Sequence, residues 1–327
     1  MDLDLLDRTL EERGEPRYRH EQVWSWVARG VGSYGEMSDL PAALRALLEE
    51  QVPLSTLRLE REERSRDATV KALLRTREGH AVETVSMRYH DGRRSLCLSS
   101  QSGCPLTCSF CATGRMRFAR NLTRDEIVDQ ALHFRRAGRV DHAVFMGMGE
   151  PMMNLDAVLG ACELLPALGI TNRRTAISTV GWIPGIERLT QSGVPVRLAL
   201  SLHAPEDALR SELMAVNERY PLADVLDACR AHYAATRRTV FVEYVMLAAV
   251  NDRYEQALAL ARLLSPREAF KVNLIPYNPT DSPYRGSSRE AIAAFRAVLE
   301  GRGVRVTVRL TRGRDIAAAC GQLAATT

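Results

Sequence analysis

The sequence predicts an α/β protein: a partial (β/α)6 TIM-like barrel that follows a small, mainly helical N-terminal domain. From Ser95 onward, short apolar runs alternate with helix-like segments, which is typical of parallel strands buried on both faces by helices. Connections of this kind are right-handed, and about six of them suit an incomplete barrel. Polar motifs follow several of the apolar runs, as expected where the carboxyl ends of barrel strands carry the chemistry.

The N-terminal part has a different pattern from the barrel. Residues 1–65 contain short amphipathic segments, among them EQVWSWVARGV, and we expect an accessory helical module there. Residues 66–94 alternate apolar and polar residues on either side of Gly79, which predicts a β extension. The barrel core and the segment after its last strand are then expected to occupy residues 95–327.

A series of apolar runs predicts the barrel strands. In chain order they are SLCLSS, HAVFMG, TAISTV, VRLALSLH, TVFVEYVML, KVNLIPYNP and VRVTVRL. The first run leads into a cysteine-rich loop, and the helix after that loop is expected to begin at a capping box formed by Thr123 and Glu126. Pro205 follows the fourth run, where a proline favours the start of a helix.

A cluster of three cysteines follows the first predicted strand. The run GCPLTCSFCATG places Cys104, Cys108 and Cys111 in a Cys-x-x-x-Cys-x-x-Cys spacing, with Phe110 before the last cysteine. Three thiolates can bind three irons of a 4Fe–4S cube and leave the fourth iron open, whereas structural zinc sites take four ligands. The spacing resembles the signature of radical S-adenosylmethionine (SAM) enzymes. Three chance cysteines or an incomplete zinc knuckle are the alternatives.

The composition bears on partners and on cellular setting. The net charge is +4, and only Lys71 and Lys271 among the 44 basic residues are lysine. Bias toward GC-rich codons explains such a composition, and so does RNA binding, because arginine pairs with phosphates and stacks on bases. The seven cysteines show no disulfide framework, and no apolar run is long enough to span a membrane. We therefore expect a cytoplasmic monomer without membrane association.

Polar residues at the ends of the predicted strands are candidates for ligand binding. Gly149, in the run GMGEPMMN, would let a ligand approach the backbone, and Glu150 would pair with an ammonium group such as the amino end of SAM. A tight turn with a solvated glutamate is the alternative. Ser178, Ser201 and His203 would hydrogen-bond a ribose or a carboxylate, or would only satisfy the loop backbone, and a histidine can also pack in the core.

Two further cysteines lie at opposite ends of the barrel sequence. Cys97 is on the first barrel strand, and Cys320 is in the C-terminal segment TRGRDIAAACGQL. Cysteine is commonly a small buried hydrophobe, a role that suits Cys162 and Cys229 within predicted helices. A thiol beside arginines is also a candidate thiolate nucleophile, so the residue types alone leave both roles open for Cys320.

Taken together, the motifs resemble those of the radical SAM rRNA adenine methyltransferases, the RlmN and Cfr enzymes, over nearly the whole chain. The motifs are GCPLTCSFCATG, RNLTRDEIVDQ, MGMGEP, SLHAP, EYVMLAAVND, NLIPYNP and RGRDIAAACGQL. The resemblance implies a radical SAM barrel, a 4Fe–4S cluster on the three clustered cysteines, the use of two SAM molecules per turnover, and an RNA-binding role for the N-terminal module.

The resemblance also implies a mechanism with two catalytic cysteines. Cys320 would take a methyl group from the first SAM and become S-methylcysteine. The second SAM, cleaved at the open iron, would yield a radical that removes a hydrogen atom from that methyl group. The resulting carbon radical would add to the adenine ring and link the protein to RNA. Cys97 would then release the product by forming a disulfide with Cys320, and Glu83 would accept a proton.

By the same resemblance, the substrate is 23S rRNA, with tRNA as a second candidate, and a flavodoxin or ferredoxin would donate the electron. Methylation of carbon 2 of an adenine is the leading expectation, which GMGEP, NLIP and TRG favour. Methylation of carbon 8, which confers antibiotic resistance, is the alternative that CATG, NERYP and YNPT favour. A non-catalytic RNA-binding relative is disfavoured by the presence of both Cys97 and Cys320. The implied SAM contacts are Gly149, Glu150, Ser178, Ser201, Leu202, His203 and Asn278.

Overall fold

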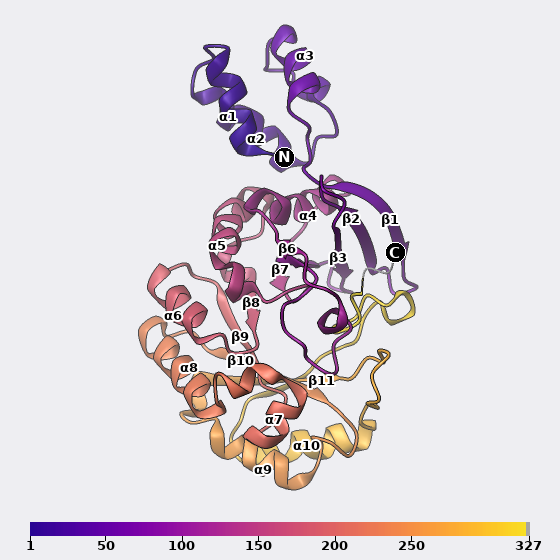
Figure 1. Ribbon diagram of the computed structural model, residues 1–327, viewed down its shortest axis with the longest axis vertical. Coiled ribbons are helices and arrows are strands. Elements are labelled where there is room, and N and C mark those ends of the chain that lie inside the picture. The colour runs from indigo at the N-terminus through magenta and orange to yellow at the C-terminus, as the bar shows by residue number, and fades with distance from the viewer. Residues whose placement is uncertain (325–327) are drawn as a thin grey trace.

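The chain forms one continuous ten-stranded sheet that changes from antiparallel to parallel along its length (Figure 1). The computed structural model describes residues 1–324, and residues 325–327 lie outside the described part. Strands β1 to β4 pair antiparallel, and from β4 onward each neighbour is parallel, in the order β4-β7-β8-β9-β10-β11-β12. The predicted α/β fold, with a parallel barrel sheet and helices at the N-terminus, is confirmed.

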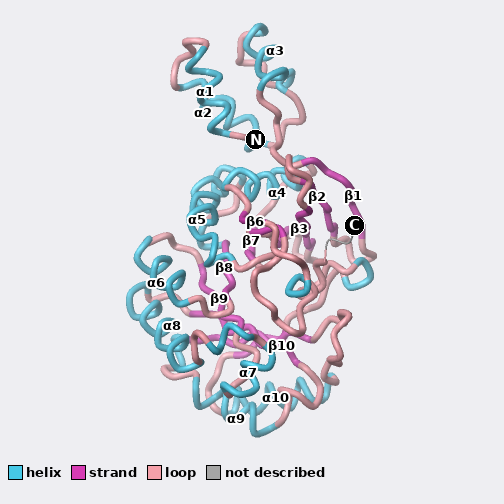
Figure 2. Tube along the Cα trace, viewed as in Figure 1, coloured by secondary structure: helices cyan, strands magenta, loops and turns pink. Residues whose placement is uncertain are grey.

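Helices cover the outer side of the parallel part, as Figure 2 shows. The strands are β1 (Arg58–Arg64), β2 (Val70–Arg75), β3 (Ala81–Arg88), β4 (Arg94–Cys97), β7 (His142–Phe145), β8 (Thr175–Thr179), β9 (Arg197–Ser201), β10 (Val240–Met246), β11 (Phe270–Pro276) and β12 (Val306–Val308). The helices are α4 (Arg124–Arg136), α5 (Leu155–Leu164), α6 (Ile183–Ser192), α7 (Asp207–Leu213), α8 (Leu222–Thr236), α9 (Tyr254–Leu263) and α10 (Arg289–Gly301).

The continuous apolar character of the barrel strands reflects burial on both faces of the sheet. Leu198, Ala199 and Leu200 are consecutive in β9 and all have 0% exposure, although successive side chains of a strand point to opposite faces. Helices account for one face, and the interior of the barrel accounts for the other. Polar side chains are therefore concentrated at the strand ends and at a few interior positions.

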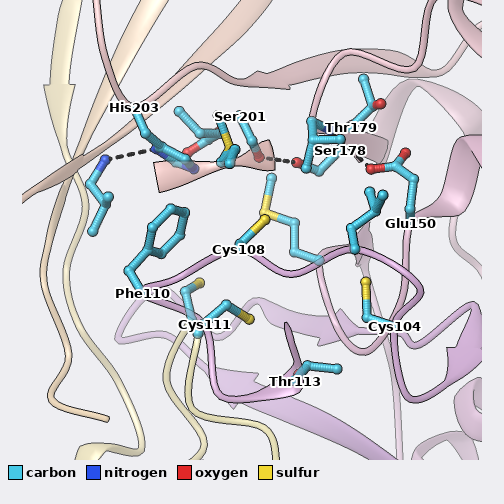
Figure 3. Close-up of a pocket in the computed structure, with 18 of the residues that line it drawn as sticks. Cys104, Cys108, Phe110, Cys111, Thr113, Glu150, Ser178, Thr179, Ser201 and His203 are labelled. Carbon is cyan, nitrogen blue, oxygen red and sulfur yellow. Dashed lines mark hydrogen bonds between the residues drawn. The ribbon is translucent and has the colours of Figure 1, made fainter. Parts of the chain in front are cut away.

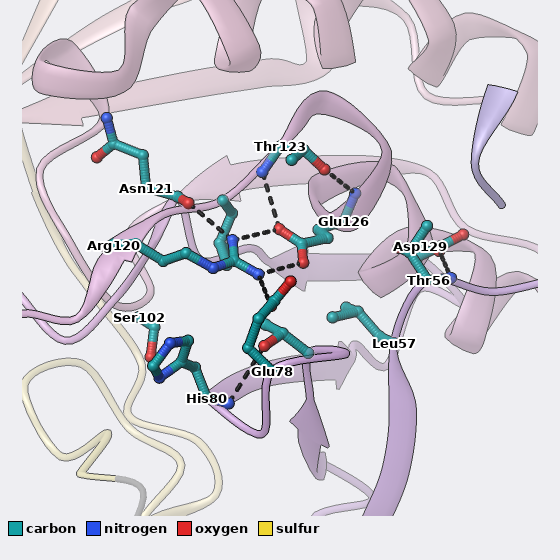
Figure 4. Close-up of polar contacts among 12 residues, drawn as sticks. Thr56, Leu57, Glu78, His80, Ser102, Arg120, Asn121, Thr123, Glu126 and Asp129 are labelled. Carbon is teal, nitrogen blue, oxygen red and sulfur yellow. Dashed lines mark hydrogen bonds and ion pairs between the residues drawn. The ribbon is translucent and has the colours of Figure 1, made fainter. Parts of the chain in front are cut away.

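Three helices precede the sheet, namely α1 (Leu3–Glu12), α2 (Tyr18–Arg29) and α3 (Ala42–Gln51), and they stand at one end of the molecule (Figure 1). Asp129 of α4 joins them to the barrel, because it receives the Met1 ammonium group and the backbone N–H of Thr56, the latter at 2.5 Å (Figure 4). A buried carboxylate requires such partners. Among the described residues, no helix is long and apolar enough to cross a membrane.

The expectation of helix to about residue 60 is wrong at its end, because strand β1 begins at Arg58. This strand, RLEREER, is exposed along nearly its whole length, so it lacks the apolar alternation that identifies a half-buried strand. Charged residues of this kind protect the edge of a sheet from further pairing. The domain boundaries at residues 65 and 94 stay predictions.

The base of the cysteine loop is fastened by a short strand pair, β5 (Gln101–Ser102) with β6 (Arg120–Asn121). The Arg120 guanidinium donates to both carboxylate oxygens of Glu126, at 2.8 and 2.7 Å, and to Glu78 at 2.6 Å (Figure 4). Glu126 also closes the capping box with Thr123, as the sequence predicts. The loop is thereby tied to the start of α4 and to the turn between β2 and β3.

Candidate active site

The three clustered cysteines and most of the predicted SAM contacts surround one cavity of about 160 Å³ at the carboxyl ends of the barrel strands (Figure 3). This first cavity lies where barrel enzymes carry their chemistry. The predicted site residues in its lining are Cys104, Cys108, Cys111, Gly149, Glu150, Ser178, Ser201, His203, Asn278 and Cys320. Leu202, Cys97 and Glu83 do not line it, and Leu202 is completely buried.

The shape of the cysteine loop depends on close backbone approaches. Gly103 has a φ of +74°, and a Cβ there would come within 2.3 Å of the Arg117 carbonyl oxygen, so only glycine fits. The C-terminal segment packs against the same loop. The Ala112 N–H donates to the Gly321 carbonyl at 2.8 Å, and the Thr113 hydroxyl donates to the Leu323 carbonyl at 2.5 Å. These contacts bring Cys320 to the rim of the cavity.

The three loop thiols fit the ligand set of an iron–sulfur cluster. Burial, and then the nearby Cys111 thiol, raises the pKa of Cys104 to about 12, and the same causes raise the pKa of Cys108 well above its ordinary value. Thiols that disfavour one another's ionisation become good ligands once bound cations supply positive charge. Residues 1–324 contain no group of three His, Cys, Asp or Glu side chains that would hold a single metal ion. A four-iron cube is wider than one ion, so thiols spread around a cavity favour the cluster over the zinc alternative.

Glu150 is held by backbone donors at the cavity wall. Its two carboxylate oxygens accept from the N–H groups of Met152, at 3.0 Å, and Val180, at 2.9 Å, and the side chain is only 3% exposed. Burial raises the pKa of Glu150 to about 7. The preceding Gly149 has a φ of +96°, and a Cβ there would meet the Gln101 side chain at 2.5 Å. The solvated-turn alternative is therefore wrong, since this carboxyl group is buried and faces the cavity.

The serine and histidine candidates occupy the opposite wall. The Ser178 and Ser201 hydroxyl groups lie 3.3 Å apart. His203 accepts a hydrogen bond at Nδ1 from the Val245 N–H, at 3.1 Å, and its ring meets the edge of Phe110 with centroids 4.8 Å apart. Burial lowers the pKa of His203 to about 3, so the imidazole is neutral. His203 thus combines core packing with a place in the cavity lining.

Cys97 and Cys320 meet at a second cavity, of about 410 Å³, which both residues line. Burial raises the pKa of Cys97 to about 12, and the neighbouring Cys320 thiol adds to this effect. Cys320 is exposed to the cavities but enclosed by protein, so desolvation raises its thiol pKa, while the Arg309 guanidinium opposes the increase. Both thiols are free in this structure.

Glu83 is placed apart from both cavities. Its carboxylate forms an ion pair with Lys71, at 3.2 Å, and accepts from the Ala324 N–H at 2.8 Å. Strand β3, which carries Glu83, pairs with β4, so the residue lies near Cys97 in the sheet although it does not share a cavity with it.

The structure adds a buried ion pair that the sequence analysis missed. Glu243 of β10 is 2% exposed and accepts from Arg309 at 3.0 Å and from Asn273 at 2.8 Å. Its Oε2 has no hydrogen-bond partner among residues 1–324, and Glu243 lines the first cavity while Arg309 lines the second. A glutamate inside the apolar run TVFVEYVML is the signal that would have identified it.

We expect Arg309→Met to shift the reaction of Cys320 with iodoacetamide to higher pH. Loss of the guanidinium removes the charge that favours the thiolate, so the thiol pKa rises further and less thiolate is present at any given pH. Mass spectrometry of the Cys320 peptide over a pH series measures the change. Arg309→Lys is the control and should retain most of the wild-type profile. Identical profiles for all three proteins would contradict this role.

Known sequence families and solved structures match the chain along its length. The pattern described as the radical SAM superfamily matches residues 98–261, and that described as the ribosomal RNA large subunit methyltransferase N-terminal domain matches residues 1–54. The protein named dual-specificity RNA methyltransferase RlmN of Geobacter sulfurreducens is 45% identical, over 99% of this chain and 90% of that protein.

Two further relatives agree with these matches. The probable dual-specificity RNA methyltransferase RlmN of Thermus thermophilus is 43% identical, over 98% of this chain and 92% of that protein. The crystal structure of a radical SAM methyltransferase from Sphaerobacter thermophilus superimposes with a TM-score of 0.93 at 43% identity, covering 100% of this chain and 98% of that one. The similarity therefore includes the N-terminal helices as well as the barrel.

Proposed function

Because the chain belongs to the RlmN family of radical SAM RNA methyltransferases, we propose that it methylates carbon 2 of an adenine in 23S rRNA and of an adenine in tRNA. The N-terminal match to a large-subunit rRNA methyltransferase domain supports the first substrate, and the dual-specificity naming of the relatives supports a second class of RNA. The single observation that carries the chemistry is the presence of Cys320 in the walls of both cavities.

Radical SAM proteins use a 4Fe–4S cluster and SAM, and here Cys104, Cys108 and Cys111 would hold the cluster. When bound, the cluster supplies the single electron that cleaves SAM, which a flavodoxin or ferredoxin would replenish. Glu150 would pair with the ammonium group of SAM. Ser178, Ser201 and Asn278 would hydrogen-bond its ribose and carboxylate groups, because all three line the same cavity.

Cys320 and Cys97 would carry the one-carbon unit and release it. The Cys320 thiolate would attack the SAM methyl group, so that a sulfur–carbon bond forms as the one in SAM breaks. After that carbon has bonded to the adenine, the Cys97 thiolate would attack the Cys320 sulfur and form a disulfide, and an external dithiol would reduce this bond. Both thiols line the second cavity, which supports such an exchange.

For the proton acceptor we retain Glu83. Its carboxylate is held by Lys71 and by the backbone of Ala324, four residues after Cys320 in the same C-terminal segment. Movement of that segment would therefore expose the carboxylate at the time when Cys320 changes partners. The protein would act as a cytoplasmic monomer.

Analysis of RNA from cells with and without the gene tests this function. Digestion of 23S rRNA and tRNA to nucleosides, followed by mass spectrometry, should reveal 2-methyladenosine only in cells that express the active protein. Appearance of 8-methyladenosine in its place would assign the alternative regioselectivity. Absence of both nucleosides would refute the proposal.

The affinity of the anaerobically prepared, cluster-containing protein for SAM is expected to rise as pH increases through about 7. The Glu150 pKa is raised to about 7, so the carboxyl group is neutral below this pH and can pair with an ammonium group only above it. Equilibrium dialysis measures the affinity. Glu150→Gln should bind weakly without this pH dependence, whereas Ser178→Ala should weaken binding and keep it. A pH-independent wild type would contradict the assignment.

A further inference from the structure

The second cavity opens away from the cluster loop, toward the amino ends of the barrel strands. Its lining begins at Arg93, His142, Arg174 and Arg197, which lie at or before the first residues of β4, β7, β8 and β9. It continues inward to Cys97, at the carboxyl end of β4, and then to Asn278 and Cys320. The cavity therefore runs through the barrel interior and reaches Cys320 from the side opposite the three loop cysteines.

The two cavities share part of a wall. Met146, Ile275, Asn278 and Cys320 line both of them. Cys320 is thus accessible from the cavity with the cluster cysteines and from the cavity with Cys97. A residue that must first take a methyl group and then present it to a large substrate needs two approaches of this kind, because both partners cannot occupy one cavity of about 160 Å³.

The opening of the second cavity is uniformly basic. Arg93, Arg174, Arg197, Arg309 and Arg312 contribute to its lining, which contains no aspartate or glutamate among the described residues. Burial and the charges of Arg174, Arg93 and Arg197 lower the pKa of His142 at this opening.

A surface hollow of about 640 Å³ adjoins the opening and continues its charge. The two share Arg197 and Phe241, and the basic residues of the hollow are Arg173, Arg197, Arg237, Arg238, Lys271 and Arg305. Its lining, too, holds no acidic residue within residues 1–324. Arg197 and Lys271 both lie over the Phe241 ring, at 5.5 and 5.9 Å from its centroid. The surface joins phosphate-binding charge to an aromatic ring, the combination that binds unpaired RNA.

We propose that the target nucleotide reaches Cys320 through the second cavity from the amino ends of the strands, while the phosphates that flank it bind the basic hollow. This inference rests on the proposed function and specifies where its RNA substrate binds. An adenine that must be flipped out of its stack needs a deep, narrow cavity with backbone contacts at the opening, and the second cavity and the hollow supply these two parts. SAM and RNA then approach Cys320 from opposite sides.

The test uses two triple variants with the same change in charge. Arg173→Gln, Arg197→Gln and Lys271→Gln remove three cations from the hollow. The described hydrogen bonds and ion pairs include none from these three side chains, so the fold should be retained. The control variant carries Arg262→Gln, Arg289→Gln and Arg302→Gln, which are exposed residues in or next to α9 and α10.

Binding of bulk tRNA to the cluster-containing protein is measured by filter retention over a salt series. For single-stranded RNA each lost phosphate contact lowers the salt slope by about 0.7, so the hollow variant should lose about 2 from its slope. SAM-dependent methylation of Cys320 should stay at the wild-type level, since the first cavity is unchanged, while methylation of RNA falls. The control variant should match the wild type in all three measurements.

A hollow variant with wild-type tRNA affinity, salt slope and RNA methylation would overturn the inference. So would an equal loss in the control variant, because that outcome would indicate dependence on net charge alone. These results remain distinct from a failure of the proposed function, in which the wild-type protein itself would produce no methylated adenosine.

Discussion

Replacing Cys104 with alanine abolishes the visible absorbance of the iron–sulfur cluster and all reductive cleavage of SAM. The three loop thiols line one cavity, and two thiolates do not hold a cube that needs at least three protein ligands to stay in place. Activity should fall below detection. Iron content, the absorbance spectrum and the yield of 5′-deoxyadenosine are the measurements, made on anaerobically prepared protein.

Cys162→Ala is the matched control for this variant. Cys162 is completely buried in α5, outside the lining of both cavities, so its loss should affect stability by about 1 kcal/mol and leave the cluster intact. Cys108→Ala and Cys111→Ala should behave as Cys104→Ala does. If a variant without all three thiols still held a redox-active cluster, the assigned ligands would be wrong.

Replacing Cys97 with alanine converts the enzyme into a trap for its RNA. Cys320 can still be methylated from the first cavity and can still bond through that carbon to adenine, but no neighbouring thiol remains to attack its sulfur. Protein linked to RNA should accumulate with no released product. It is detected as a nuclease-sensitive increase in mass on the Cys320 peptide.

Further variants identify the step at which this trap forms. Cys320→Ala should give no crosslink and no product, because nothing carries the one-carbon unit. The double variant should behave like Cys320→Ala, since losses in sequential steps are not additive. Normal turnover by Cys97→Ala would show that Cys97 is an ordinary buried thiol and that another group releases the RNA.

The sequence was most informative where chemistry requires a fixed spacing. Cys104, Cys108 and Cys111 are local in the chain, and the carboxyl ends of parallel strands meet at one edge of a barrel, so Glu150, Ser178 and Ser201 could be assigned to one cavity before the structure was seen. The positive φ values at Gly103 and Gly149 also follow a local pattern.

Other features depend on contacts between distant segments and could not be predicted. Arg309 and Glu243 are 66 residues apart, and only the pairing of the last strands brings them beside Cys320. Glu83 has the position in the sequence that the family resemblance assigns to it, yet its carboxylate lies against Lys71 and outside both cavities. Strand β1 was missed because its residues are mainly charged.

The contacts between the C-terminal segment and the cysteine loop couple iron loading to the readiness of the methyl acceptor. Ala112 and Thr113 of the loop bond to Gly321 and Leu323, on either side of which Cys320 and Ala324 follow the same path. Metal binding that orders the loop must therefore also favour the docked position of Cys320, and linkage makes the effect reciprocal. Iron-starved or oxygen-damaged molecules would lose their acceptor geometry together with their redox centre, so they would consume no SAM in futile methylation.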